Sequence, residues 1–290
     1  MENIRYLRET DLADCMRLKE AAGWNQTLAD WQALLRCAPL GCFGVESDEK
    51  VVATATAVVH KDVGWVGMVL TDPLYRGRGF ATALMKCCLD YLDSRVETVK
   101  LDASAEGESL YRKLGFVEEA VIERWACPAP LDSADHRLRA IPNLGIPNLG
   151  IPNRNIPSRD RQGAVPPPEA LRVQQAALLP TPYAGPLRHA DIPLDAVAEC
   201  AGAWAAGRAG SAAWYFGPCY GLDSAPVELV ARALLAGRGR AYWDLFPSHA
   251  AAAVAGRLGF APARRLLRMV RGTPAPTTPD VYAISGFEWG

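Results

Sequence analysis

The stretch DPLYRGRGFATALM, residues 72–85, decides how this chain is interpreted. Two arginines alternate with two glycines, and good helix formers follow them. The first amides of a helix have no partner within the helix, so a helix start attracts anions. Gly77 and Gly79 let the backbone approach an anion closely, and Arg76 and Arg78 can offset its charge. The pattern predicts a diphosphate site, although a solvent-exposed basic loop would have the same composition.

This turn differs from two common phosphate-binding motifs. No Gly-Lys-Ser/Thr follows it, as in the loop that binds nucleoside triphosphates, and its glycines do not have the spacing G-x-G-x-x-G. The preceding strand must stop at Asp72-Pro73, because the residue before proline avoids helical geometry and proline has no amide to donate. The turn therefore joins a strand to a helix expected over residues 79–94.

Composition indicates a soluble globular protein of two domains. The chain has 290 residues, of which half are apolar, and a net charge of −1. This balance predicts neither nucleic-acid nor membrane partners, and no apolar run approaches the roughly 18 residues of a membrane span. The eight cysteines lack metal-ligand spacing, so we expect no metal and read them as reduced thiols of a cytoplasmic protein.

Strand and helix patterns alternate over residues 1–127, which predicts an α/β domain with a mixed sheet and helices on its faces. Thr10 and Thr27 are expected to cap its first two helices. The predicted strands are 5–7, 41–47, 51–60, 64–71, 97–103 and 116–125, and the later helices 79–94 and 107–114.

Residues 128–175 differ in composition, since nine of the 22 prolines lie between Pro128 and Pro168. The run IPNLGIPNLGIPNRNIP repeats every five residues, which is too short for a packed unit. We interpret the segment as a semi-rigid linker, with a docking peptide for a partner as the alternative.

Residues 176–290 regain globular character. Strands are predicted within 202–211, 212–221 and 240–246, and helices within 225–237 and 248–260, the second capped by Ser248. The closing YAISGFEWG is expected to add a final strand.

The run Arg76–Ala81 resembles the acetyl-coenzyme A signature of the GNAT N-acetyltransferases, Arg/Gln-x-x-Gly-x-Gly/Ala. The resemblance extends back to Val69-Leu70-Thr71-Asp72-Pro73 and forward to SLYRKLGF, with Tyr111 and Gly115-Phe116 at the family's Tyr and Gly-Phe. It implies the GNAT fold, a central mixed and mostly antiparallel sheet flanked by helices. The second domain resembles a smaller, degenerate GNAT unit without the arginine–glycine turn, as in tandem members.

The resemblance also implies an acetyl-coenzyme A-dependent N-acetyltransferase acting on a primary amine, either a small molecule or a protein N-terminus or lysine. The pantetheine arm would add beside residues 69–71 as an extra strand. Tyr111 would protonate the leaving thiolate, and Asp102 is the first candidate for the base. Trp24, Asn25, Gln26 and Trp31 lie where the family binds its acceptor. The residues expected to hold the cofactor are Val69, Leu70, Thr71, Arg76, Gly77, Arg78, Gly79, Phe80, Ala81, Thr82 and Ser104, the last at a position where the family often has asparagine.

Two other functions fit the same sequence. The chain could bind coenzyme A as a regulator without turnover, in which case Tyr111 would be replaceable. It could also act as an interaction protein through the IPNLG tract, in which case deleting the tract would abolish its role.

Overall fold

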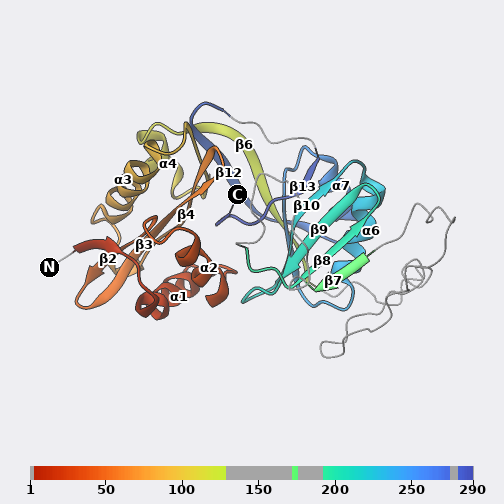
Figure 1. Cartoon of the computed structure of the whole chain (residues 1–290), viewed down its shortest axis with the longest axis horizontal. Helices are drawn as coiled ribbons and strands as arrows, with labels where there is room; N and C mark the ends of the chain where they lie inside the picture. Colours follow the sequence, from red (N-terminus) through yellow and green to blue (C-terminus); the bar gives the residue numbers. More distant parts are fainter. Residues whose placement is uncertain (1–2, 129–171, 176–191, 275–279, 290) are drawn as a thin grey trace, which may run out of the picture.

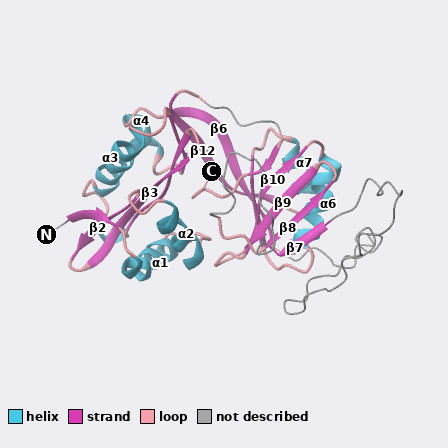
Figure 2. Ribbon diagram, in the orientation of Figure 1, coloured by secondary structure: helices cyan, strands magenta, loops and turns pink. Residues whose placement is uncertain are grey.

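Strands from both ends of the chain join in one mixed sheet (Figures 1 and 2). The computed structural model describes residues 3–128, 172–175, 192–274 and 280–289. We call residues 3–128 the first half and the described residues from 172 onward the second half. Among the described residues the strand order is β1-β2-β3-β4-β5-β12-β6-β11-β10-β9-β8-β7, with β13 paired to β10. Parallel pairing occurs between β4 and β5 and between β10 and β11, and the other described pairs are antiparallel.

The first half places two helices on each face of its strands (Figure 1). α1 and α2 pack on one face around Trp31, while α3 packs on the other around Phe80 and Leu84. Thr27 caps α2 as predicted, because its hydroxyl accepts from the amide of Asp30. The elements are β1 (Asn3–Tyr6), a 3-10 helix (Glu9–Asp11), α1 (Leu12–Ala21), α2 (Leu28–Cys37), β2 (Cys42–Ser47), β3 (Lys50–His60), β4 (Val63–Thr71), a 3-10 helix (Pro73–Tyr75), α3 (Phe80–Asp93), β5 (Thr98–Ala103), α4 (Glu108–Lys113) and β6 (Val117–Cys127).

The second half repeats the strand–helix order with its own core. Its largest fully buried side chains include Trp243, Phe216 and Tyr215, and α6 and α7 cover one face of its strands. The elements are β7 (Arg172–Gln175), β8 (Ala196–Cys200), β9 (Ala203–Arg208), β10 (Trp214–Gly221), α6 (Ser224–Leu235), β11 (Ala241–Leu245), α7 (Ala250–Arg257), β12 (Ala261–Gly272) and β13 (Val281–Ala283).

The two halves exchange strands where they meet. β12 belongs to the second half in sequence but lies between β5 and β6 of the first, pairing Leu267 with Ala103 on one side and with Val121 on the other. β6 in turn pairs with β11, so that Trp125 faces Trp243. The sheet therefore has no edge at the junction, and each half needs a strand from the other to complete it.

Buried ion pairs lock this junction. Arg124 of β6 donates to both carboxylate oxygens of Asp244 of β11, at 2.8 and 2.6 Å. Arg268 of β12 donates to both oxygens of Asp102 of β5, at 2.9 Å each. Burial lowers the pKa of Arg124, and the Asp244 carboxylate more than reverses that effect, so the guanidinium remains charged.

The mixed, mostly antiparallel sheet flanked by helices is confirmed. Several local predictions were wrong. Thr10 lies inside the 3-10 helix that precedes α1 and does not cap α1, and the cap of α7 is His249, whose ring accepts from Ala251, not Ser248. The closing segment does add a final strand, as predicted, but this strand is short, Val281–Ala283.

β7 lies where the sequence suggested the end of the linker, and β12 was not foreseen. The IPNLG repeat lies outside the described residues, so its spacer and docking interpretations stay predictions.

Among the described helices, none is both long and apolar enough to span a membrane. The described part of the chain also has no cluster of three or more potential metal ligands.

We predict that Asp244→Ala lowers the free energy of unfolding by about 3–5 kcal/mol, because it leaves the Arg124 guanidinium buried without its counter-ion. Urea denaturation measures the change. The double variant Arg124→Met/Asp244→Leu should lose much less, since no charge is then stranded. An Asp244→Ala loss no larger than that of the double variant would show that the pair does not lock the junction.

Candidate active site

β4 separates from β5 after a short stretch of pairing. The parallel ladder between them joins Val63–Trp65 to Thr98–Lys100 and includes no later residue of β4. Met68 has a positive φ of 50°, and the register of β3 against β4 shifts beside it. The Thr54 hydroxyl donates to the Met68 carbonyl at 2.8 Å, which holds this bulge. Residues 66–71 are therefore turned away from β5 and leave a row of backbone groups facing a gap.

A wide cleft occupies this gap. Its empty space is about 2040 Å³, counting the solvent at its mouth. The walls come from the end of β4, the turn before α3, the start of α4, the end of α1, and β12 of the second half. The predicted cofactor residues that line it are Val69, Leu70, Thr71, Arg76, Gly77, Gly79, Phe80, Ala81, Thr82 and Ser104. Residues chosen from a short sequence pattern thus lie around one cleft.

The turn before α3 has the conformation that its glycines permit. Gly77 and Gly79 have φ of +78° and +81°, which side chains with a Cβ rarely adopt. Gly79 is the residue before the first turn of α3, so the unpaired amides of that turn begin directly after it. Arg76 lines the cleft, whereas Arg78 does not and its guanidinium stacks over the Tyr75 ring at 4.8 Å. The turn therefore presents at least one cation beside a helix start.

Tyr111 borders the cleft from α4. Its side chain is 8% exposed and its ring packs edge-on against Phe116. A Cβ at Gly107 would lie 2.8 Å from the ring, so the missing side chain there lets Tyr111 lie against the loop. Burial raises the pKa of Tyr111 to about 12, with a smaller effect of Cys88. The phenol is therefore protonated at neutral pH and can donate a proton.

A second, inner pocket continues from the cleft into the junction of the two halves. Its empty space is about 590 Å³, including the open part. The cleft and the inner pocket share several lining residues, among them Val69, Ser104 and Tyr111. These residues lie where one space opens into the other. Trp24 and Gln26 reach the inner pocket from the loop between α1 and α2. The remaining lining includes Gly67, Met68, Asp102, Arg124, Arg264, Phe287 and Glu288.

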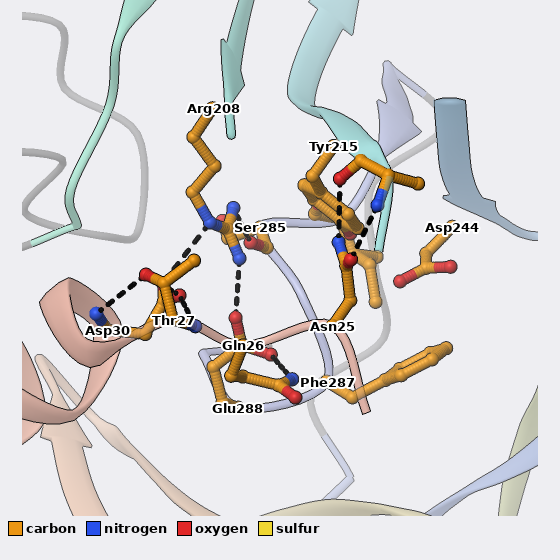
Figure 3. A network of polar contacts seen from close by, with 12 residues as sticks. Asn25, Gln26, Thr27, Asp30, Arg208, Tyr215, Asp244, Ser285, Phe287 and Glu288 are labelled. Atoms are coloured by element: carbon orange, nitrogen blue, oxygen red, sulfur yellow. Dashed lines mark hydrogen bonds and ion pairs between the residues drawn. The ribbon is translucent and has the colours of Figure 1, made fainter. Parts of the chain in front are cut away.

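The structure places three predicted site residues in roles other than those expected. Asp102 lines the inner pocket, but both of its oxygens accept from Arg268, so its charge is already matched. Trp31 is 0% exposed in the core between α1 and α2 and lines neither space. Asn25 binds the second half instead, since its side chain accepts from the amides of Ala212 and Ala213 and donates to the Ala213 carbonyl (Figure 3).

Five lining residues from the second half were not predicted from the sequence. Arg264, Arg265 and Leu266 come from β12, and Phe287 and Glu288 come from the segment that follows β13. They lie 185 to 212 residues from the turn in sequence (264 − 79 and 288 − 76), and no local pattern marks them as lining residues. Arg264 borders both spaces and has no ion pair among the described residues. The second half thus builds part of the cleft wall.

The corresponding place in the second half is closed. Only residues 222–223 connect β10 to α6, compared with eight residues between β4 and α3. A Cβ at Gly221 would lie 2.1 Å from Val227, so α6 begins directly against the strand. β10 pairs with β11 over Trp214–Phe216, and beyond that stretch β13 pairs with Cys219 and Tyr220. In the second half, β13 therefore occupies the position beside β10 that corresponds to the open position beside β4.

Comparisons with known proteins agree with this geometry. Residues 7–116 match the family model described as Acetyltransferase (GNAT) family, and no curated protein sequence matches the chain. A candidate acetyltransferase from Pyrococcus horikoshii is 15% identical with a TM-score of 0.72, covering 100% of this chain and 96% of its own. A tandem GNAT protein from the clavulanic acid biosynthesis pathway is 15% identical with a TM-score of 0.62, covering 95% and 100%. A GCN5-related N-acetyltransferase from Sphaerobacter thermophilus is 14% identical with a TM-score of 0.55, covering 97% and 98%. At these identities the likeness shows the fold alone, and the family match applies to residues 7–116, which fit the acetyltransferase (GNAT) family model.

Proposed function

We propose that this protein transfers the acetyl group of acetyl-coenzyme A to a primary amine, by direct attack within a ternary complex. The observation that carries the proposal is the open edge of β4, which leads into the Arg76–Gly79 turn and shares its cleft with Tyr111. The domain division at residues 1–127, 128–175 and 176–290 is part of the proposal, with the first domain catalytic and the third degenerate.

The cofactor fits the cleft through its two polar parts. The backbone groups of Val69 and Thr71 would pair with the amides of the pantetheine arm, in the manner of an added strand. The first amides of α3 and the Arg76 guanidinium would hold the diphosphate. The thioester then lies near Tyr111, where the cleft opens into the inner pocket.

The reaction needs three things from the protein. A neutral amine must reach the carbonyl carbon, the oxyanion must be stabilised, and the thiolate must be protonated as it leaves. A backbone amide of the separated part of β4 is placed to stabilise the oxyanion. Tyr111 is the proton donor for the thiolate. We propose Trp24 and Gln26 as acceptor contacts, because both line the inner pocket, and assign Asp102 to orienting Arg268.

We predict that Tyr111→Phe lowers turnover by roughly 10²–10⁴-fold, because it removes one general acid and keeps the packed ring. The assay follows release of free coenzyme A thiol from acetyl-coenzyme A against a panel of amino acids, polyamines and peptides. Acetyl-coenzyme A affinity should stay as in wild type. A wild-type rate in the variant would limit Tyr111 to packing, and binding without turnover on any amine would favour the regulator.

We predict that Gly79→Val weakens acetyl-coenzyme A binding by roughly tenfold or more, about 1.4 kcal/mol, measured by calorimetry. A Cβ at a φ of +81° strains the turn and displaces the first amides of α3. Gly237→Val is the matched control, because Gly237 has a φ of +68° and equally open surroundings but lies after α6. Equal affinity in wild type and Gly79→Val would contradict the placement of the diphosphate.

We predict one bound acetyl-coenzyme A per chain. In the second half Asp223 would repel a diphosphate, the two-residue connection leaves no turn to hold it, and β13 occupies the strand position. Calorimetric titration of the intact chain should give a stoichiometry near one. Two equivalent sites would show that β13 and the start of α6 can be displaced.

A further inference from the structure

The segment after β13 crosses from the second half to the first. The Ser285 carbonyl accepts from Arg208 of β9 at 2.9 Å, and the Phe287 carbonyl accepts from Trp65 Nε1 of β4 at 2.9 Å. Trp289 is 0% exposed in the core around α1 and α2. Residues 285–289 are therefore anchored on both halves, and the C-terminus lies between them (Figure 1).

The backbone of Glu288 packs against Gly67 of β4, two residues beyond the last residue of β4 that pairs with β5. A Cβ at Gly67 would lie 3.1 Å from Glu288 Cα and 3.2 Å from its carbonyl oxygen, so a side chain at Gly67 would push the segment away. Glu288 is 2% exposed and lines the inner pocket together with Tyr111 and Val69. A buried carboxylate thus shares a pocket with the proposed proton donor.

The charges around Glu288 do not balance (Figure 3). Its Oε1 accepts from Arg208, and the same guanidinium lies 3.3 Å from Asp30 Oδ1 of α2. These three side chains are 5% exposed or less, so two buried carboxylates share one cation. Arg124 lines a small cavity together with these three side chains, but it is already matched by Asp244. Within the described part of the chain, no second cation is paired with Asp30 or Glu288.

Burial raises the pKa of Glu288, the Arg208 guanidinium opposes that rise, and the Asp30 carboxylate adds to it. Because its pKa is raised, the Glu288 carboxylate accepts a proton more readily than an exposed glutamate does.

Gln26 provides a second, independent feature of the site. Its Nε2 donates to Glu288 Oε2 at 2.6 Å, which orients the amide (Figure 3). Its Oε1 is buried and has no hydrogen-bond partner among the residues that the structure describes, although buried acceptors are nearly always satisfied. Gln26 is 5% exposed and lines the inner pocket. A ligand that donates an N–H would satisfy this oxygen.

We infer that Glu288 and Gln26 bind the primary ammonium group of the acceptor and that Glu288 is the general base that deprotonates it. This inference rests on the proposed acetyltransfer and names its amine-binding site. The ammonium supplies the missing positive charge and donates to Gln26 Oε1. The proposed catalytic carboxylate therefore belongs to the C-terminal segment of the second half, although it acts in a pocket beside β4 of the first half.

The proton balance is complete with these groups. The ammonium gives one proton to Glu288, and the freed nitrogen lone pair bonds to the thioester carbonyl carbon. The C–S bond breaks, and the leaving sulfur takes the Tyr111 proton. The acetylated nitrogen loses its second proton, which restores the Tyr111 hydroxyl through solvent. Glu288 releases its own proton to water, so that the reaction yields an amide, free coenzyme A and one proton.

The test measures amine binding separately from turnover. The intact chain is saturated with coenzyme A and titrated with n-butylamine by calorimetry. Glu288→Gln and Gln26→Leu should each weaken n-butylamine binding at least tenfold, whereas acetyl-coenzyme A affinity stays within twofold of wild type. Glu228→Gln is the control, since that carboxylate is also ion-paired with arginine, here Arg232 and Arg257, but lies on α6, outside both spaces. It should bind n-butylamine as wild type does.

The pH dependence of kcat/KM provides the second readout, with the best amine from the panel. Wild-type kcat/KM should fall as the pH is lowered through the pKa of Glu288, because the protonated carboxyl cannot accept a proton. In Glu288→Gln this acidic limb should disappear and the rate should fall by roughly 10²–10⁴-fold.

Wild-type n-butylamine affinity in both variants, or no n-butylamine binding to the wild-type chain loaded with coenzyme A, would overturn the inference. So would an unchanged acidic limb in Glu288→Gln. If Glu288→Gln does not fold, Gln26→Leu decides the question alone. Failure of the wild-type chain to bind acetyl-coenzyme A is a separate result, which would reject the proposed function itself.

Discussion

Beyond Trp65, β4 no longer pairs with β5, and the backbone groups exposed by this separation need partners from elsewhere. The bulge at Met68, held by the Thr54 hydroxyl, turns the strand away, so the gap is a property of the fold itself. Unpaired backbone donors and acceptors are costly when they are buried away from water. The first half leaves its gap open as a cleft, in which a cofactor with amides along its arm could replace the missing strand. The cleft and the inner pocket both begin at this separation.

The second half has the same separation between β10 and β11 but fills it from within. β13 pairs with Cys219 and Tyr220, and the chain then continues as residues 284–289 toward the first half. The segment from β13 onward thus fills the gap beside β10 and then extends into the inner pocket beside β4. The strand that fills the gap in the second half and the residues that bring Glu288 to the first half are therefore parts of one continuous segment. The second half thus contributes residues to the cleft and to the inner pocket.

The fold was predictable from sequence where its signals are local. The glycines and arginines of residues 76–79, the stop at Asp72-Pro73 and the cap at Thr27 each act within a few residues, and the structure forms a strand, a turn and helices there. The insertion of β12 between β5 and β6 was not predictable, because it depends on register between segments about 150 residues apart. The ion pair of Asp102 was not predictable for the same reason, because its partner Arg268 lies on the inserted strand β12. Glu288 was missed because its importance comes from Gly67, Arg208 and Gln26, which only the folded chain brings together.

Strand exchange also explains why the pocket can hold so much buried charge. Arg124, Asp244, Arg268 and Asp102 all lie on strands that pair across the junction, so the backbone ladders fix their separations. A buried ion pair offsets the cost of removing its charges from water only when its geometry is held well. A rigid ladder provides that geometry, whereas two domains joined only by a linker would not. The cluster of Asp30, Arg208 and Glu288 is built differently, from a helix, a strand and the terminal segment, and among the described residues its two carboxylates pair with one arginine. The junction therefore combines ion pairs that are complete and structural with one that is incomplete and faces the pocket, where a positively charged substrate would complete it.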